Sequence, residues 1–147
     1  MILIDSGAII AYIDRRDEHH KWIEDQMAIL KPPFYTCESV ISESCFILTE
    51  KGLDVSGIFT LLERGALIVS FELQREHQFV ALLLKKYRNL PMDVADACLV
   101  TMAENEPRAS VLTTDGDFLI YRKSNRQIIP CLMPEKVKNR ARRKIHR

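Results

Sequence analysis

Four acidic residues stand at positions from which their carboxylates could hold a metal ion. Asp5 ends a short apolar run, Asp115 follows another, and Glu43 and Asp96 lie near the starts of predicted helices. Two carboxylates about 4 Å apart repel by roughly 4 kcal/mol at an effective dielectric constant of 20, so four of them in one pocket require protons or a cation. No lysine or arginine stands at the end of these segments. We therefore expect a divalent metal ion as the counterion.

The types of side chain narrow the choice of metal. Carboxylate oxygens without cysteine or paired histidine ligands suit Mg²⁺ or Mn²⁺ rather than zinc. The cysteines have no spacing typical of a zinc or redox motif, so we interpret them as buried hydrophobic residues. A bound Mg²⁺ or Mn²⁺ can generate a hydroxide from water and neutralise charge on a phosphodiester. The cysteines are Cys37, Cys45, Cys98 and Cys131.

Short apolar runs that alternate with helical patterns predict the elements that would position these acids. Such a succession is typical of an α/β fold with a parallel sheet and helices on both faces. In such sheets, ligands bind beyond the carboxyl ends of the strands, near the point where the strand order reverses. We expect strands at 1–4, 34–37, 66–69, 110–113 and 128–132, and helices at 8–13, 19–30, 39–51, 54–64, 73–87 and 93–105.

The charge of the chain is distributed unevenly. Its 147 residues carry a net charge of +1, but residues 134–147 alone hold seven basic residues and one acid, a charge of +6, which leaves −5 for residues 1–133. We expect one domain over 1–133 and a flexible basic extension over 134–147. No apolar run is long enough to span a membrane, and Asp5 interrupts any secretory signal, so we expect a cytoplasmic protein.

The ordered set of motifs resembles the PIN domain family. The residues that carry the resemblance extend over about residues 1 to 132 and are Asp5-Ser6, Glu43, Ala95-Asp96-Ala97 and Thr113-Thr114-Asp115-Gly116-Asp117-Phe118. The resemblance implies a PIN-like (Rossmann-like) three-layer α/β/α fold with a central parallel sheet of four to five strands. It also implies an endoribonuclease dependent on Mg²⁺ or Mn²⁺. Short members of the family are often VapC-type toxins held by an antitoxin, and they often form homodimers.

Carried over residue by residue, the resemblance assigns the metal site and its surroundings. Asp5, Glu43, Asp96 and Asp115 would be the catalytic metal ligands, with Ser6, Thr113 and Asp117 as accessory residues. Asp93 precedes Asp96 by three positions, so we interpret it as the residue that caps the helix beginning there.

Basic residues outside the motifs are candidates for contacts with RNA phosphates, although the same charges would suit a solvated surface or an acidic partner. His19 and His20 are expected at the solvated surface, because they fall on a polar helix start far from the four acids in sequence. The candidates for RNA binding are Arg122, Lys123, Arg126, Lys136, Lys138, Arg140, Arg142 and Arg143.

Two other functions compete with a ribonuclease. One is a catalytically silent PIN-like module that binds RNA or a protein partner, which the complete set of acids disfavours. The other is an aspartyl-phosphate enzyme with Asp5 as nucleophile, which would require a second acid where Gly7 stands. The sequence identifies neither an RNA target nor an antitoxin.

Overall fold

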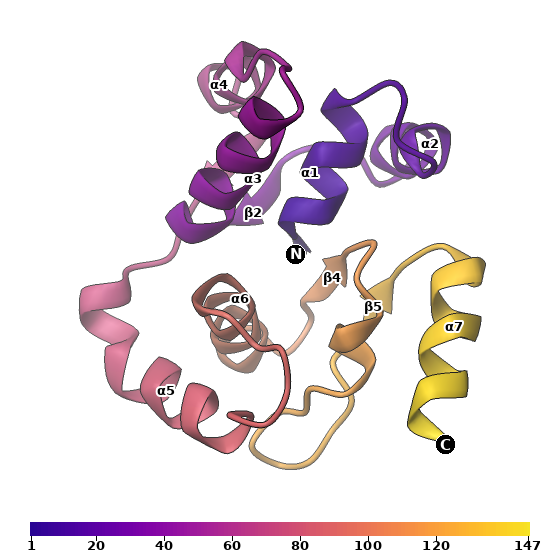
Figure 1. Ribbon diagram of the computed structural model, residues 1–147. Helices are drawn as coiled ribbons and strands as arrows, with labels where there is room; N and C mark the ends of the chain where they lie inside the picture. The colour runs from indigo at the N-terminus through magenta and orange to yellow at the C-terminus, as the bar shows by residue number, and fades with distance from the viewer.

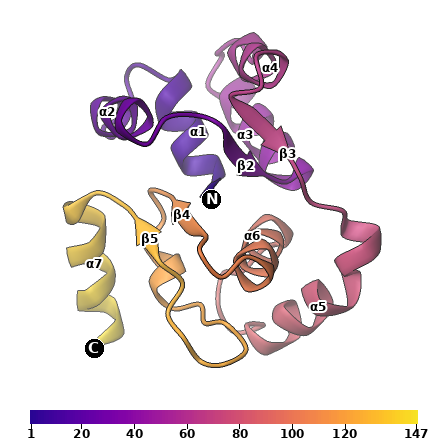
Figure 2. The ribbon, with the colours of Figure 1, turned by 180° about the vertical axis from the view of Figure 1, so that it is seen from behind.

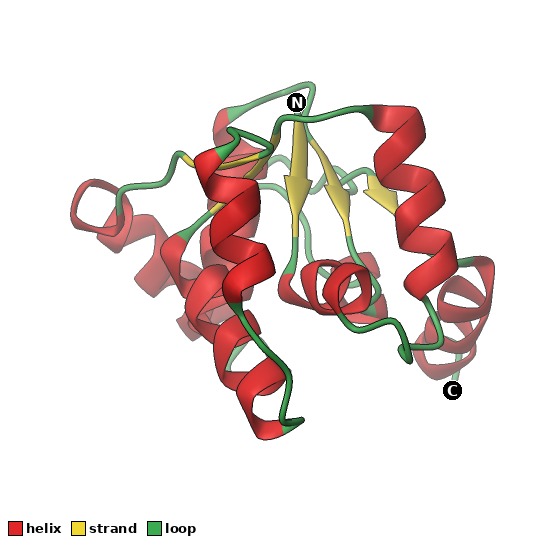
Figure 3. Cartoon of the chain, turned by 90° about the horizontal axis from the view of Figure 1, so that it is seen from above, coloured by secondary structure: helices red, strands yellow, loops and turns green.

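The computed structural model describes residues 1–147, and at its centre lies a parallel sheet of five strands. Figure 3 shows neighbouring strands running in the same direction between helices. The α/β architecture with four to five parallel strands is thereby confirmed. In spatial order the strands are β3 (Leu67–Val69), β2 (Phe34–Thr36), β1 (Ile2–Ile4), β4 (Ser110–Leu112) and β5 (Cys131–Leu132).

The strand predicted at 128–132 is shorter than expected. Only Cys131 and Leu132 pair with β4, whereas Ile128 forms an isolated antiparallel bridge with Arg122. The chain between these two residues folds back on itself, which leaves Ile128 63% exposed instead of in the sheet.

Six helices flank the sheet in two groups. Figure 1 shows the four helices of residues 6–63 gathered on one side of the sheet and the two helices of residues 73–105 on the other. Right-handed crossovers explain this grouping, because β1 to β3 run toward one edge and the connection to β4 must return across the opposite face. No helix of the chain is long and apolar enough to cross a membrane. The helices are α1 (Ser6–Ile13), α2 (His20–Leu30), α3 (Glu38–Glu50), α4 (Ser56–Glu63), α5 (Leu73–Lys86) and α6 (Val94–Asn105).

The helix that carries Asp96 lies deep in the protein. Every residue of α6 from Ala95 to Ala103 is buried, because the helix packs between α5 and strands β1 and β4. A helix enclosed in this way must be apolar around its whole circumference, which explains the small and aliphatic residues that surround Asp96.

The strand order reverses between β1 and β4. β2 and β3 follow β1 toward one edge, whereas β4 and β5 extend toward the other. Asp5 directly follows β1, and Asp115 lies three residues beyond β4. The two acids therefore stand at the topological switch point, where ligands bind in open parallel sheets.

The extension expected to be flexible is a helix in the structure. Helix α7 (Glu135–Ile145) follows β5 and packs against the 3₁₀ helix η1 (Gly116–Leu119) (Figure 2). Its apolar stripe consists of Val137 and Ala141, both buried. Gly116 permits the close approach, since a Cβ atom there would lie 2.7 Å from the Cβ of Ala141. Two apolar residues one turn apart thus give this strongly basic helix a face that packs against the domain.

Candidate active site

The four predicted ligands meet in one pocket. Asp5, Glu43, Asp96 and Asp115 come from four separate segments and line a cavity of about 270 Å³. Pro91 is the only apolar side chain that lines this cavity, and the remaining residues around it are Ser6, Gly7, Asp93 and Asp117. The structure therefore brings together seven of the eight catalytic and accessory residues inferred from the sequence, and Thr113 contacts two of them, as described next.

Asp5 is held on both of its carboxylate oxygens. It is the N-cap residue of α1, and Oδ1 accepts a hydrogen bond from the backbone N–H of Ser6 at 2.6 Å. Oδ2 accepts a second one from Oγ1 of Thr113 at 2.8 Å. Only 3% of Asp5 is exposed, and burial raises its pKa to about 7, although these two hydrogen bonds act to lower the pKa. Asp5 therefore caps the helix and also presents an acid to the pocket.

Gly7 allows the loop after β4 to reach the start of α1. A Cβ atom at this position would collide with Oγ1 of Thr114. The glycine of the Asp5-Ser6-Gly7 turn thus leaves room for Thr114 in the segment that carries Asp115.

The segment after β4 is ordered by a chain of hydrogen bonds. Oγ1 of Thr113 accepts from the backbone N–H of Asp115 at 2.9 Å, and Oδ1 of Asp115 accepts from the N–H of Asp117 at 2.9 Å. Burial raises the pKa of Asp115, and the charge of Asp117 adds to this effect. The position of Asp115 is therefore fixed from both sides.

Asp96 and Asp93 form a capping box at the start of α6. Oδ1 of Asp93 accepts from the N–H of Asp96 at 2.8 Å, and Oδ2 of Asp96 accepts from the N–H of Asp93 at 3.3 Å. The prediction that Asp93 caps this helix is confirmed. Asp96 is 7% exposed, and burial, strengthened by the charges of Asp93 and Asp5, raises its pKa to about 8.

Tyr121 is a site residue that the sequence did not reveal. Its hydroxyl donates to Oδ2 of Asp96 at 3.2 Å, and burial raises the pKa of Tyr121, which keeps the hydroxyl protonated as a donor. Phe118 and Tyr87 pack edge-on against its ring and fix its orientation. Nothing in the local sequence around Tyr121 points toward Asp96, because the contact joins segments 25 positions apart.

Glu43 lies in the second turn of its helix. The helix begins at Glu38 with Cys37 as N-cap, one residue before the predicted start at residue 39. Its pKa is raised by burial and by the charges of Asp93 and Asp115, whereas a hydrogen bond from Ser6 acts to lower it. Glu43 thus shares the electrostatic environment of the other acids.

The donor set suits a hard divalent cation. Every ligand candidate is a carboxylate, and three of the four are markedly desolvated, which is costly without a counterion. As the side chains stand, no three of them are close enough together to hold a metal ion. Chelation therefore requires the carboxylates to turn toward a common point within the pocket.

Two cations adjoin the acids, contrary to the sequence-based expectation. A second pocket of about 290 Å³ lies beside Asp115 and Asp117 and is also lined by Arg140 and Lys144 of α7. Neither cation has a carboxylate oxygen within 4 Å, although the charge of Lys144 lowers the pKa of Asp115. The sequence did not predict them here because their position depends on the docking of α7.

The two histidines are less exposed than expected. The His19 side chain is 15% exposed and lines the pocket beside Asp115, while the His20 side chain is 20% exposed. Nδ1 of His20 lies 2.7 Å from the carbonyl oxygen of Ala11, which anchors the start of α2 to α1. Both side chains are therefore partly buried rather than fully solvated, and only His19 adjoins one of the acids.

Three of the predicted RNA-binding residues do not face the acids. Lys123 is 8% exposed, and the guanidinium of Arg122 donates to the carbonyl oxygens of Leu119 and Tyr121. The loop that holds Arg126 is anchored through Ser124 to Glu104, eight residues and about 12 Å along α6 from Asp96. Burial, backbone hydrogen bonds and distance thus exclude these side chains from the pocket.

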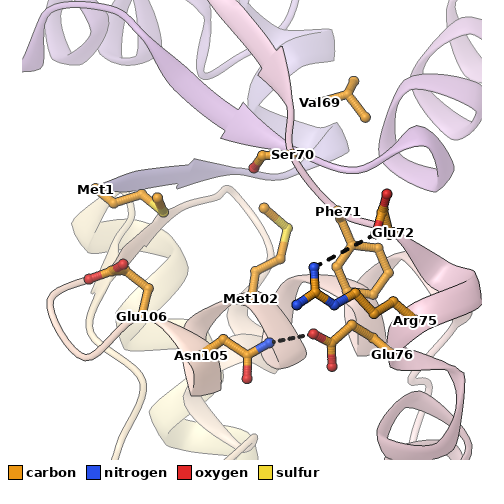
Figure 4. Close-up of a pocket in the computed structure, with 10 residues that line it drawn as sticks. All are labelled: Met1, Val69, Ser70, Phe71, Glu72, Arg75, Glu76, Met102, Asn105 and Glu106. Carbon is orange, nitrogen blue, oxygen red and sulfur yellow. Dashed lines mark hydrogen bonds and ion pairs between the residues drawn. The ribbon is translucent and has the colours of Figure 1, made fainter.

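A further pocket of about 460 Å³ lies away from the acids (Figure 4). Met1, Phe71 and Met102 line it together with charged residues of α5. Four of its polar side chains are paired with each other, since Asn105 donates to Glu76 at 3.0 Å and Arg75 lies 4.0 Å from Glu72. This pocket contains none of the residues that the sequence marks for chemistry.

Comparisons with known proteins agree with this architecture. A family model described as PIN domain matches residues 2–123. Among solved structures, the chain is similar to the crystal structure of Mycobacterium tuberculosis VapC20, described as a sarcin-ricin loop cleaving toxin. The TM-score is 0.67 at 17% sequence identity, and the match covers 80% of this chain and 92% of that one. A search of curated proteins finds no match.

Proposed function

This chain belongs to the PIN domain family, and we propose that it is an endoribonuclease that uses a divalent metal ion, Mg²⁺ or Mn²⁺, to hydrolyse RNA phosphodiesters. The observation that carries the proposal is the convergence of Asp5, Glu43, Asp96 and Asp115 in one polar pocket at the switch point of the sheet. Such a group of desolvated acids suits a divalent ion and a phosphate substrate.

The acids divide into two pairs by their degree of burial. Asp5 and Asp96, which are 3% and 7% exposed, would be the central ligands, while Glu43 and Asp115 would complete the coordination from the sides. The bound ion would activate water for in-line attack and stabilise the attacking and leaving oxygens.

The neighbouring side chains position these ligands. Thr113 and the N–H of Ser6 hold the two oxygens of Asp5, and Tyr121 with the N–H of Asp93 holds Oδ2 of Asp96. Hydrogen bonds of this kind orient metal ligands, and their loss typically costs about 10- to 100-fold in metal affinity or activity.

We propose that α7 supplies the contacts to the RNA backbone. Arg140 and Lys144 are one turn apart, and both line the pocket beside Asp115 and Asp117. Lys136 and Lys138 are engaged with Glu18 and Glu135, at 3.5 Å and 3.7 Å, so we assign them a smaller part. Arg142 and Arg143 are exposed and remain candidates for outer phosphates.

We also propose that the protein is the toxin of a VapBC-type pair, with an antitoxin protein as its partner. The support is the PIN domain assignment together with a fold similar to that of VapC20, which is described as a toxin. The RNA target of VapC20 is not transferred to this chain, since the two proteins share 17% identity. Inhibition of cleavage by the product of a neighbouring gene would test this part of the proposal.

The activity is tested by incubating the purified protein with a panel of defined single-stranded and stem-loop RNAs in Mg²⁺, in Mn²⁺ and in a chelator. We expect cleavage at discrete positions with either ion, none with the chelator, and recovery when the ion is returned. RNA binding without cleavage under all conditions would instead identify a catalytically silent binding module.

A further inference from the structure

A groove opens on the outer side of the acidic pocket, between α3 and the start of α6. It measures about 680 Å³ and lies where the two helices contact each other. From α3 it is lined by Ser39, Ser42, Glu43 and Phe46, which are spaced so that they share one helical face. The opposite wall consists of Asp93, Val94 and Ala95.

Phe46 presents an uncovered aromatic surface in this groove. It is 67% exposed, and Val94 across from it is 43% exposed. A flat ligand that covered the ring would gain both hydrophobic and stacking energy. Phe46 stands three positions from Glu43, so a ligand stacked on it would lie next to the acids.

The groove and the acidic pocket are adjacent. Glu43 and Asp93 line both of them. An RNA strand whose phosphate lies at the acids would therefore have a neighbouring nucleoside within reach of the groove.

The charge of the groove decides which part of RNA it suits. Its ionisable residues are Glu38, Glu43 and Asp93, and no lysine, arginine or histidine lines it. A phosphate group would be repelled here, whereas a base is neutral and planar and carries amino donors. The hydroxyls of Ser39 and Ser42 and the carboxylate of Glu38 can accept hydrogen bonds from such donors.

We propose that this groove binds the base of the nucleotide next to the cleaved phosphate, with Phe46 as the stacking surface and an amino-bearing base as the favoured occupant. The proposal rests on the proposed ribonuclease function and adds a specificity-determining residue to it. Stacking of a base on a protein aromatic ring is sequence-tolerant in itself, so the preference comes from the acceptors along α3.

The test compares Phe46→Ala and Phe46→Trp with the control Phe59→Ala. Phe59 is 54% exposed on α4 and lines neither pocket, so its removal changes a similar area of exposed aromatic surface. Each change is made in an Asp96→Asn background, so that binding of a fluorescent RNA is measured without cleavage. The RNA is one that the wild-type protein cleaves, and it is prepared with an abasic residue at each position in turn.

We expect Phe46→Ala to weaken RNA binding about tenfold, within the range measured for stacked bases, and we expect Phe46→Trp and Phe59→Ala to bind like the parent. RNA with an abasic residue at one position next to the cleavage site should bind the parent protein more weakly by a similar factor. The same abasic residue should not weaken RNA binding by Phe46→Ala any further. In the active background, Phe46→Ala should broaden the choice of base at that position.

Two results would overturn the assignment of the groove to a base. One is unchanged RNA binding by Phe46→Ala. The other is independent effects, in which Phe46→Ala and the abasic position together weaken binding by the product of their separate factors. If Phe46→Ala also converts a dimer to a monomer, and its effect on RNA binding is independent of the abasic position, the groove is assigned to a second copy of the chain. If the wild-type protein neither binds nor cleaves any RNA, the proposed function itself fails, and this inference fails with it.

Discussion

Thr113 donates a hydrogen bond from Oγ1 to Oδ2 of Asp5 at 2.8 Å, although the two residues are 108 positions apart in the chain. The bond joins the carboxyl ends of β1 and β4, the two strands between which the sheet reverses its order. The same oxygen of Thr113 accepts from the N–H of Asp115. One buried hydroxyl thus links two of the four acids.

We predict that Thr113→Val impairs both stability and activity. The valine leaves Oδ2 of Asp5 and the N–H of Asp115 without these partners, which should cost about 1–3 kcal/mol in the free energy of unfolding. Cleavage should slow by about 10- to 100-fold through misplaced ligands. Thermal unfolding and initial cleavage rates measure the two effects. Thr113→Ser, which keeps the hydroxyl, should retain most of the stability and most of the cleavage rate. Equal losses in Thr113→Val and Thr113→Ser would refute the role of the hydroxyl.

We predict that Tyr121→Phe weakens metal binding while the fold persists. The change removes only the hydroxyl that donates to Asp96, and the packing against Phe118 and Tyr87 is kept. The Mn²⁺ concentration needed for half-maximal cleavage should rise about tenfold. Tyr87→Phe is the matched control, because the Tyr87 hydroxyl accepts from the N–H of Arg122 and does not contact an acid. An identical Mn²⁺ dependence in Tyr121→Phe and Tyr87→Phe would contradict this account.

The metal-free protein should lose stability as the pH rises. The pKa of Asp5 is about 7 and that of Asp96 about 8 in the folded chain, against an ordinary value of 3.8. The folded state therefore binds more protons than the unfolded state between about pH 4 and pH 8, and its free energy of unfolding falls through that interval.

Addition of Mn²⁺ should reverse this trend, because the ion binds the ionised carboxylates and displaces their protons. The increase in melting temperature caused by Mn²⁺ should be small at pH 5.5 and large at pH 8.5. Thermal scans of the chelated and Mn²⁺-loaded protein at both pH values check the prediction. An increase that is independent of pH would be inconsistent with acids that are protonated near neutrality.

Much of the site could be predicted because its acids follow patterns that are local in the sequence. The apolar run before Asp5 and the three-residue spacing of Asp93 and Asp96 indicate a strand end and a helix cap, and both are found. Tyr121 could not be predicted, since only the tertiary fold brings its hydroxyl to Asp96.

The helix at the end of the chain could not be predicted, for a different reason. The strong positive charge of this segment predicts a flexible extension, whereas in the structure Val137 and Ala141 form a stripe that fits against Gly116. The same docking determines which basic residues adjoin the acids, and it favours Lys144 over Lys123. Composition alone contains no information on such packing.

Replacement of Arg140 and Lys144 by glutamine should weaken RNA binding and flatten its salt dependence. If each side chain neutralises one phosphate, the slope of log K against log salt should decrease in magnitude by about 2 in the double variant, or slightly less for single-stranded RNA. Mn²⁺ binding should persist, because neither residue is a ligand. Arg126→Gln is the control and should leave the slope unchanged, because Arg126 lies in the loop that Ser124 anchors to Glu104, far along α6 from Asp96. Equal slopes for the double variant and the wild type would exclude these two residues from the RNA interface.

The most direct measurement is Mn²⁺ titration calorimetry and RNA cleavage on one preparation each of wild-type protein and Asp96→Asn. The substitution keeps the size of the side chain and removes the charge. We predict that Asp96→Asn melts at the same or a higher temperature than the metal-free wild type at pH 8, loses measurable Mn²⁺ binding, and cleaves RNA at least about 100-fold more slowly. Asp96→Asn protein that remains folded and still cleaves RNA at the wild-type rate with Mn²⁺ would contradict the assignment of this pocket as a metal-dependent ribonuclease site.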